Sequence, residues 1–382
     1  MSSTAKVAVI GGGVIGCAIA YNLAKQGCTD VVVFDKGYLA GGSTGRCGAG
    51  VRCQWGTEMN CRLALESINM FEHLNEELGY EYDIEFKQKG YLILAHTEKE
   101  WEQFKKNVKL QNSLGIPSKL LSPEEARETV PHLRTDGMLG ATYCTKDGHC
   151  NPHHTTWAYA RAAKRLGVKV RSFVEVKDVR VKNGRVTRVI TTGGDYDVEA
   201  VVNAAGAWAK PVGEMVGVDI PVYPERHHIL VTEPCSMIQD PMVMSFSKHI
   251  YCQQTPHGSF VMGYGDPNER KDYDVGHTWQ FLETMVDTVL PVLPILGELR
   301  LVRQWSGLYE ISPDAQPILG ETPQVDGFYM AVGFSGHGFM LAPVVGKLLA
   351  ETILDKPTSL DISMLDLGRF ERGEMIREPS VV

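Results

Sequence analysis

Residues 6–35 read KVAVIGGGVIGCAIAYNLAKQGCTDVVVFD, and this stretch decides the fold. The apolar run KVAVI predicts a short buried strand, and the glycines that follow it predict a tight turn. The next residues have the composition of a helix that ends at Gly27, and a second apolar strand then ends at Asp35. A strand, a helix and a strand in this order form a βαβ unit, so the sequence predicts an α/β domain.

The glycines in this stretch have the spacing of a dinucleotide-binding turn. Gly11, Gly13 and Gly16 follow the first strand and open the helix, and Asp35 lies about 20 residues further on. The first glycine permits the tight turn, the second lets a pyrophosphate touch the backbone, and the third lets helix and strand pack closely. The helix N-terminus then offers N–H groups to the phosphates, and Asp35 can accept hydrogen bonds from a ribose. An incidental glycine-rich turn is the alternative, but strand, helix and acid all agree with the dinucleotide interpretation.

Three further segments are rich in small residues. Residues 41–50, GGSTGRCGAG, have almost no bulk and can lie flat against a large planar ligand. Residues 203–208, NAAGAW, follow an apolar strand, and residues 333–339, GFSGHGF, open the last helix, where N–H groups suit an anion. Each segment alone also fits an ordinary loop or turn. Together they favour FAD over a nicotinamide dinucleotide.

The composition is that of a globular protein. Of the 382 residues 43% are hydrophobic and 22% are charged, which excludes a disordered chain, a coiled coil and a collagen-like rod. The net charge of −8 argues against nucleic acid as a partner. Nine cysteines in a long chain indicate reduced thiols, and no signal peptide or membrane-spanning segment is predicted. We therefore expect a cytoplasmic location.

The remaining chain alternates between helical and strand-like patterns. A capping box at Ser122-Pro123-Glu124-Glu125 predicts the start of one helix. The expected helices cover 58–78, 97–113, 122–129, 154–166 and 339–354, and the expected strands cover 86–96, 170–181, 186–193, 227–233 and 258–264. This order indicates a discontinuous architecture, in which a β-rich domain is inserted into the first domain in two pieces.

The motifs together resemble the FAD-dependent amine oxidoreductases of the D-amino-acid-oxidase-like superfamily. The likeness is greatest to the β subunits of heteromeric sarcosine oxidases and of dye-linked L-proline dehydrogenases. GSTGRCGAGVR, NAAGAWA, SPDAQPILG and GFSGHGF carry it over nearly the whole chain. It implies a mixed α/β (α+β) fold, with an FAD-binding Rossmann-like domain and an inserted antiparallel, β-rich substrate domain. The expected FAD-binding domain comprises 1–85, 147–220 and 300–382, and the expected substrate domain comprises 86–146 and 221–299.

The resemblance also implies an activity, the oxidation of the C–N bond of a small secondary or primary amino acid. A hydride passes to flavin N5, and the imine that forms is hydrolysed. Arg52 matches the position that holds the substrate carboxylate, and a guanidinium suits a carboxylate because it offers two parallel hydrogen bonds. Tyr251 matches an aromatic residue over the substrate, and His337 lies beside the expected flavin. A solvated or pyrophosphate-facing arginine, a half-buried sheet tyrosine and a packing histidine are the alternatives.

Residues for FAD binding follow from the same motifs. The expected cofactor-binding residues are Gly11, Gly13, Val14, Ile15, Gly16, Asp35, Lys36, Ser43, Thr44, Arg46, Cys47, Gly48, Val176, Ala204, Ala205, Gly206, Trp208, Gly307, Gly336, His337, Gly338, Phe339 and Met340.

Departures from the family pattern refine these expectations. Residues 305–309 contain no cysteine, so non-covalent FAD is expected. Pro152 stands where heteromeric sarcosine oxidases attach FMN to a histidine, which leaves non-covalent FMN at a subunit interface as an option. Val261 stands where oxidases carry a lysine near flavin N5, so a dehydrogenase is favoured over an oxidase of the sarcosine or glycine oxidase type. Met340 stands where single-chain sarcosine oxidases carry a second lysine for the substrate carboxylate. The resemblance further implies other subunits of a hetero-oligomeric complex, or a separate electron acceptor, as partners.

Three competing interpretations stay open. Cys144, His149, Cys150, His153 and His154 form a dense group, but their spacing matches no familiar zinc motif, so no metal is expected. A nicotinamide-dependent dehydrogenase would use the same glycine turn. A non-catalytic FAD-bearing assembly subunit would need neither Arg52 nor Tyr251.

Overall fold

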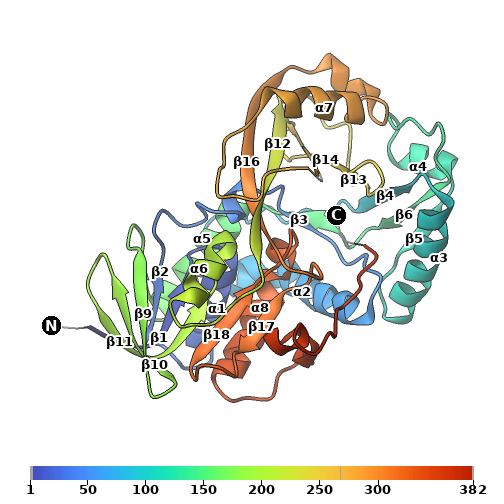
Figure 1. Cartoon of the computed structure of the whole chain (residues 1–382). Coiled ribbons are helices and arrows are strands. Elements are labelled where there is room, and N and C mark those ends of the chain that lie inside the picture. The colour runs from blue at the N-terminus through green and yellow to red at the C-terminus, as the bar shows by residue number, and fades with distance from the viewer. Residues whose placement is uncertain (1–2, 267, 381–382) are drawn as a thin grey trace.

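The computed structural model describes residues 3–266 and 268–380, which form two eight-stranded sheets and a two-stranded ribbon. Figure 1 shows the first sheet and its helices in the lower half of the molecule and the second sheet above them. No helix among these described residues is both long enough and apolar enough to cross a membrane.

The first sheet grows from the βαβ unit that the sequence predicts. Its main path runs β17-β18-β11-β1-β2-β8, and the hairpin of β9 and β10 continues from β11. The pairs of β1 with β2 and with β11 are parallel. Its strands are β1 (Ser3–Ile10), β2 (Val31–Phe34), β8 (Lys169–Arg171), β9 (Val176–Lys182), β10 (Arg185–Thr191), β11 (Tyr196–Asn203), β17 (Ile318–Glu321) and β18 (Phe328–Val332).

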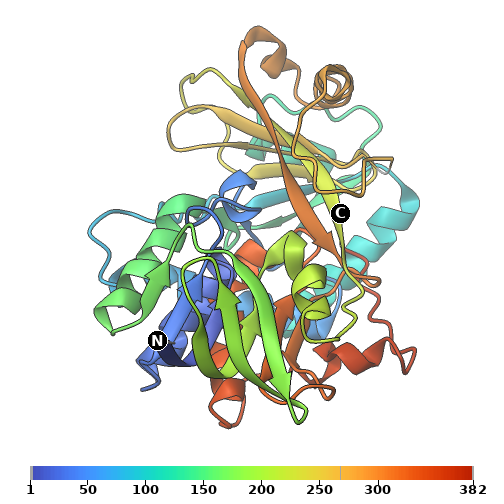
Figure 2. The ribbon, with the colours of Figure 1, turned by 60° about the vertical axis from the view of Figure 1, so that its left-hand side comes forward.

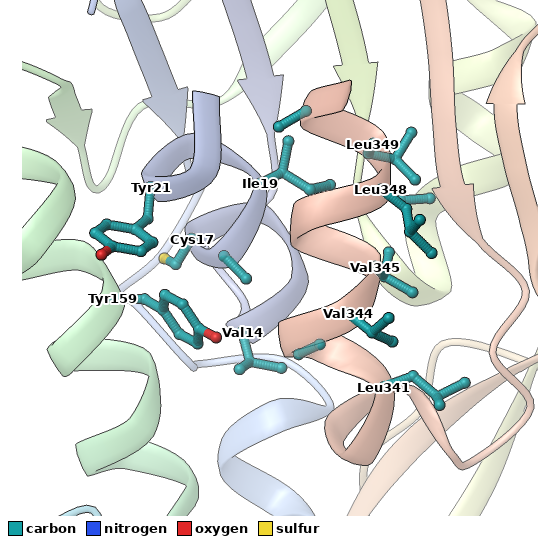
Figure 3. Close-up of a cluster of buried hydrophobic side chains, with 14 of the residues drawn as sticks. Val14, Cys17, Ile19, Tyr21, Tyr159, Leu341, Val344, Val345, Leu348 and Leu349 are labelled. Carbon is teal, nitrogen blue, oxygen red and sulfur yellow. The ribbon is translucent and has the colours of Figure 1, made fainter. Parts of the chain in front are cut away.

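Helices cover the first sheet and form the largest core. α1 (Val14–Lys25) lies between α5 (Pro152–Arg165) and α8 (Gly338–Ile353), as Figure 3 shows, with Tyr159 on one side and Leu348 on the other. A Cβ at Gly346 would lie 2.8 Å from the Cβ of Ala18, so glycine at this position lets α1 and α8 approach closely. α2 (Glu58–Glu77) packs on α8, and the short α6 (Ala209–Glu214) follows β11.

The second sheet is antiparallel except for the pair of β4 and β13. Its order is β16-β12-β15-β14-β13-β4-β6-β5. Figure 2 shows β16 descending from the upper half of the molecule toward the first sheet. The strands are β4 (Tyr91–Ala95), β5 (Lys119–Leu121), β6 (Gly140–Cys144), β12 (Tyr223–Thr232), β13 (Met242–Ser245), β14 (Ile250–Gln254), β15 (Phe260–Tyr264) and β16 (Leu301–Ile311). The accompanying helices are α3 (Glu98–Ser113), α4 (Pro123–Thr129) and α7 (Trp279–Val289). β3 (Gly50–Val51) and β7 (Gly148–His149) form the ribbon.

The expected fold class is confirmed, and the bounds of all five expected strands differ from the observed ones, most of all for the strands expected over 170–181 and 86–96. The strand expected over 170–181 is two strands, because Phe173 has a φ of 58° and the chain turns there to bond with Gly37 and Asp35. The strand expected over 86–96 begins only at Tyr91, because Gly90 before it has a φ of 88°. The capping box at Ser122 is confirmed. β16 pairs with β12 and so belongs to the second sheet, while the division into two domains stays a prediction.

Candidate functional site

A cavity of about 380 Å³ lies between the two sheets. Its wall is formed by the β1–α1 turn, the loop after β2, the end of β11, part of β16 and the start of α8. The predicted site residues on this wall are Gly11, Gly13, Val14, Ile15, Asp35, Lys36, Ser43, Thr44, Arg46, Cys47, Val176, Ala204, Ala205, Gly206, Trp208, Tyr251, Gly307, Gly336, Gly338 and Phe339. The predicted residues away from the wall are Gly16, Gly48, Arg52, His337 and Met340.

Glycine is required at two positions of the β1–α1 turn. Gly11 has a φ of 117°, and a Cβ there would collide with the carbonyl of Ala204 on the neighbouring strand. A Cβ at Gly16 would collide with the carbonyl of Gly11, so Gly16 supports the turn from behind the cavity wall. Gly13 leaves the first turn of α1 without a side-chain cap, and this helix end points its N–H groups toward the cavity wall.

Asp35 closes the turn at the end of β2. Its carboxylate oxygens accept hydrogen bonds from the backbone N–H groups of Gly12 and Gly37, each at 2.7 Å. These bonds fix the carboxylate on the cavity wall, and each oxygen retains a lone pair for a further donor such as a ribose hydroxyl.

The residue after Asp35, Lys36, forms a stack with two aromatic rings. The ammonium of Lys36 lies 3.4 Å from the centre of the Trp208 ring, and Tyr273 stacks on Trp208 with ring centres 5.7 Å apart. Trp208 and Lys36 both line the cavity. A cation over the indole face is a stabilising arrangement, so it holds Trp208 in place.

The loop after β2 is bonded to α1 and to the second sheet. Thr44 Oγ1 accepts from the N–H of Val14 at 3.2 Å, and Ser43 Oγ donates to the carbonyl of Leu308 at 2.6 Å. Arg46 Nη1 donates to the carbonyl of Ser306 at 3.0 Å. Gln253 Nε2 donates to the carbonyl of Gly48 at 2.6 Å. Gly48 therefore joins the loop to β14 instead of lining the cavity.

The donors and the shape of this wall fit FAD. Neither N-cap residue, Gly13 of α1 or His337 of α8, caps its helix through its own side chain, and residues of both helix starts lie on the one cavity. Gly336 has a φ of 93°, and a Cβ there would collide with the ring of Tyr309. One helix start suits a pyrophosphate, and the other suits the electron-rich edge of a reduced flavin. Small residues between them leave room for a planar ring system.

The second sheet contributes an aromatic chamber to the cavity, formed by Tyr251, His227, Tyr309 and Ile229. The rings of His227 and Tyr309 are stacked, with centres 3.7 Å apart and planes inclined by 17°. Nε2 of His227 lies 3.2 Å from Oε1 of Glu225, which orients the imidazole. Burial, and then Tyr309, raises the pKa of Tyr251 well above its usual range, so Tyr251 is a neutral phenol.

Arg52 and His337 lie behind the cavity wall, and both contact Trp55. The Arg52 guanidinium lies 3.8 Å from the centre of one Trp55 ring, and the His337 ring meets Trp55 edge to face at 5.1 Å. Burial, and then the charge of Arg52, lowers the pKa of His337 to about 3, so this ring is neutral. Met340 belongs to α8 and lies in the largest hydrophobic core, and its carbonyl accepts a hydrogen bond from Ser67 Oγ.

Glu310 is a half-buried acid on the cavity wall. Burial raises its pKa to about 7, against weaker lowering by the backbone N–H groups of Gly333 and Phe334. Its Oε2 has no hydrogen-bond partner among the described residues. Glu310 thus links β16 to the loop that opens α8. With a pKa of about 7, its carboxyl group changes its protonation state near neutral pH.

The cysteines and histidines of 144–154 do not gather into one group. In the part of the chain that the structure describes, the one cluster with three possible ligand atoms within 4.8 Å of one another is Cys53, Cys144 and Asp147. Cys53 Sγ lies 3.8 Å from Cys144 Sγ and 3.1 Å from Asp147 Oδ1. Asp147 also accepts from Gln54 Nε2 at 2.8 Å. The cluster is internally hydrogen-bonded, and the absence of a metal stays a prediction.

His227, Tyr309, Ile229 and Glu310 are site residues that the sequence analysis did not single out. The strand expected over 227–233 contained a signal, because residues 227 and 229 share one face of a strand. Tyr309 and Glu310 lie between two of the family motifs. Which face of β16 lines the cavity depends on pairing with β12, and the sequence does not specify that pairing.

Comparison with known proteins gives consistent matches over the whole chain. The profile of the family described as "FAD dependent oxidoreductase" (DAO) matches residues 6–352. The chain is 31% identical to the sarcosine oxidase subunit beta of Arthrobacter sp. over 378 residues, covering 97% of this chain and 92% of that protein. It is 31% identical to the glycine oxidase of Geobacillus kaustophilus over 370 residues, covering 95% and 96%. The crystal structure of L-proline dehydrogenase from P. horikoshii matches with a TM-score of 0.93 and 38% identity, covering 98% of this chain and 100% of that one.

Proposed function

Because the chain belongs to the DAO family of FAD-dependent oxidoreductases, we propose that it oxidises the C–N bond of a small secondary or N-methyl amino acid. Proline, hydroxyproline and sarcosine are the leading substrate classes. One observation carries this proposal: the cavity joins a dinucleotide turn to an aromatic chamber formed by Tyr251, His227 and Tyr309. The names of similar proteins, sarcosine oxidase subunit beta and L-proline dehydrogenase, support the substrate class.

Each part of the site has a role in this proposal. When bound, FAD supplies the acceptor for the hydride that leaves the carbon next to the amine nitrogen. Tyr251 and the stacked His227–Tyr309 pair close over the substrate and orient that C–H bond. Arg52 binds the substrate carboxylate, and His337 and Arg52 both pack against Trp55. The FAD is held without a covalent bond by the residues of the glycine turn and the loop after β2.

A dehydrogenase fits the cavity better than an oxidase. Among the described residues, Lys36 is the one lysine on the cavity wall, and its ammonium lies over the ring of Trp208. A positive charge near the flavin ring assists oxygen, so a chamber without lysine favours another electron acceptor. The alternative, an oxidase of the sarcosine or glycine oxidase type, is supported by the match to glycine oxidase.

We also propose that the chain works in the cytoplasm as one subunit of a hetero-oligomer. The curated relative is named as a β subunit, which supports partner chains. The exposed rings of Tyr82 and Trp157 and the half-buried ring of His154 form an aromatic group around the start of α5, with ring centres 5.7–5.8 Å apart. This group is a suitable surface for FMN at a subunit interface.

An anaerobic screen tests the function. Purified protein is mixed with single amino acids, and bleaching of the flavin absorbance is followed without air. We expect bleaching by proline, hydroxyproline or sarcosine, and slow recovery of colour when air is admitted. Rapid recovery in air would favour the oxidase. Flavin that no amino acid bleaches would overturn the proposal in favour of a non-catalytic FAD-bearing subunit, and protein without flavin bands would favour a nicotinamide enzyme.

A further inference from the structure

Residues 374–380 form an extended segment that ends beside Arg52. The segment contains no helix or strand. In Figure 1 the red end of the chain rises from the lower half of the molecule to a position between the two sheets, near β3. At its base, the N–H of Ile376 donates to Asp314 Oδ2 at 3.2 Å. We call residues 374–380 the strap.

The guanidinium of Arg52 is bonded to main-chain carbonyls. Nη1 donates to the carbonyl of Gln54 and Nη2 to the carbonyl of Ser380, each at 2.6 Å. Arg52 is 4% exposed, and no carboxylate of a described residue forms an ion pair with it. A charged carboxylate binds a guanidinium more strongly than a neutral carbonyl does. The Ser380 carbonyl is therefore a weak partner at a position where a carboxylate would bind better.

The strap is held mainly by Glu378, which lies at the N-terminus of α2. Its carboxylate accepts from the N–H groups of Gly56 at 2.8 Å and Thr57 at 3.0 Å, and from Asn60 Nδ2 at 3.0 Å. A carboxylate at this end of a helix also meets the positive end of the helix dipole. Pro379 packs against Gly56, where a Cβ would collide with its ring. Glu378 thus positions Ser380 without itself touching Arg52.

A second contact joins the strap to the other half of the molecule. Ser380 Oγ accepts a hydrogen bond from Asn107 Nδ2 of α3 at 3.0 Å. Asn107 is buried, and it is also held by Gln103 at 2.7 Å. The tip of the strap is therefore bonded to α2 through Glu378, to α3 through Asn107 and to the loop after β3 through Arg52.

We propose that the strap is an internal competitor of the substrate, in which the Ser380 carbonyl occupies Arg52 until the carboxylate of an amino acid displaces it. This inference rests on the proposed role of Arg52 in the function above. Binding of the substrate then requires the strap to withdraw, and the apparent affinity equals the intrinsic affinity multiplied by the fraction of molecules in which Arg52 is free. Glu378 is a positioning residue, because it sets that fraction.

The first test compares Glu378→Gln with Glu374→Gln in the holoenzyme. Both changes remove one carboxylate from the strap, but Glu374 is exposed and pairs only with Arg372. The probe is pyrrole-2-carboxylate, a planar carboxylate without a hydrogen at Cα, and its Kd is read from the change in flavin absorbance. We expect Glu378→Gln to lower that Kd about fivefold or more. Its KM for L-proline should fall by the same factor, with kcat unchanged. Equal Kd values in the two variants would overturn the proposal.

The second test locks the strap with a disulfide between Asn107→Cys and Ser380→Cys, whose native side chains meet. The oxidised form should bind pyrrole-2-carboxylate about tenfold more weakly than the form treated with a thiol reductant, since the locked strap keeps Arg52 occupied. The wild-type protein, treated in the same way, is the control. Equal affinity in both forms overturns the strap proposal even if Glu378→Gln fails to fold. Loss of flavin bleaching by every amino acid would instead count against the proposed function, because the pyrrole-2-carboxylate titration does not depend on turnover.

Discussion

Arg369 and Asp314 form a two-pronged ion pair that is almost completely buried. Nε and Nη2 of the arginine each lie 2.9 Å from one carboxylate oxygen, and both side chains are 1% exposed. Asp314 belongs to the SPDAQPILG motif, and it also accepts from the N–H of Ile376. The pair thus ties the chain after β16 to the base of the strap.

Replacing Asp314 should destabilise the protein strongly. Asp314→Asn leaves the buried Arg369 without its charged partner, and we expect a loss of about 3–5 kcal/mol in the free energy of unfolding. The matched control is Asp366→Asn, which removes an exposed partner of Arg372 and should cost about 1 kcal/mol or less. Thermal melts of the two variants give the comparison, and similar melting temperatures would contradict the expected difference.

Asp35→Ala should weaken FAD retention. The change removes an acceptor for the ribose and also frees the N–H groups of Gly12 and Gly37, so the turn loses its support. We expect the Kd for FAD to rise about tenfold or more, with substrate preference unchanged. The FAD content after gel filtration is the measurement. Asp30→Ala, which removes a hydrogen bond to the exposed Lys6, is the control and should keep its FAD.

Arg52→Ala should weaken substrate binding more than it slows turnover. Loss of the guanidinium removes the proposed partner of the substrate carboxylate, at an expected cost of about 2–4 kcal/mol in binding. Steady-state kinetics with L-proline separate KM from kcat. Arg62→Ala, on the exposed side of α2, should leave both parameters unchanged. A near-normal KM in Arg52→Ala would remove Arg52 from the site.

The His227–Tyr309 stack should contribute to catalysis through its shape. His227→Ala removes one ring of the stacked pair. We expect kcat/KM to fall about threefold to tenfold, which corresponds to the interaction energy of one aromatic pair. His227→Phe keeps a ring but loses the contact with Glu225, and should retain most of the activity. If both variants behave like the wild type, the stack is only a packing contact.

The raised pKa of Glu310 should make the free energy of unfolding decrease as the pH rises. Its folded pKa of about 7 lies above the ordinary value of 4.5, because burial disfavours the charged form. The unfolded chain therefore releases this proton first, and the folded state loses stability as the pH rises from about 5 to about 7. Glu310→Gln removes the titrating group. The melting temperature of this variant, relative to that of the wild type, should therefore increase as the pH rises over the same range. A constant difference between the two proteins from pH 5 to pH 8 would contradict this assignment.

Much of the cofactor half could be predicted from the sequence, because its signals are local. The turn at Gly11, the acid at Asp35 and the helix that ends near Gly27 depend on neighbours within one βαβ unit. Backbone conformation and close packing dictate glycine at these positions, whatever the ligand. The same holds for the capping box at Ser122, whose two hydrogen bonds lie within four residues.

The substrate half depended on contacts that are distant in the sequence. Tyr309 and His227 meet because β16 pairs with β12 across about 80 residues, and no local pattern specifies that register. Arg52 illustrates the same point, since one of its two hydrogen-bond partners, Ser380, is separated from it by 328 positions. The sequence therefore indicated that the Arg52 guanidinium could bind a carboxylate, but it did not indicate that the strap contacts this guanidinium.

The loop of Gly41–Cys47 has a practical consequence for how the protein fails. It lies along the cofactor cavity and is bonded at once to α1, through Thr44, and to β16, through Ser43 and Arg46. We therefore expect the release of FAD and the separation of the two halves of the molecule to depend on the same loop. On heating, the yellow colour should leave the protein in the same step in which the upper half comes loose, and added FAD should delay both together.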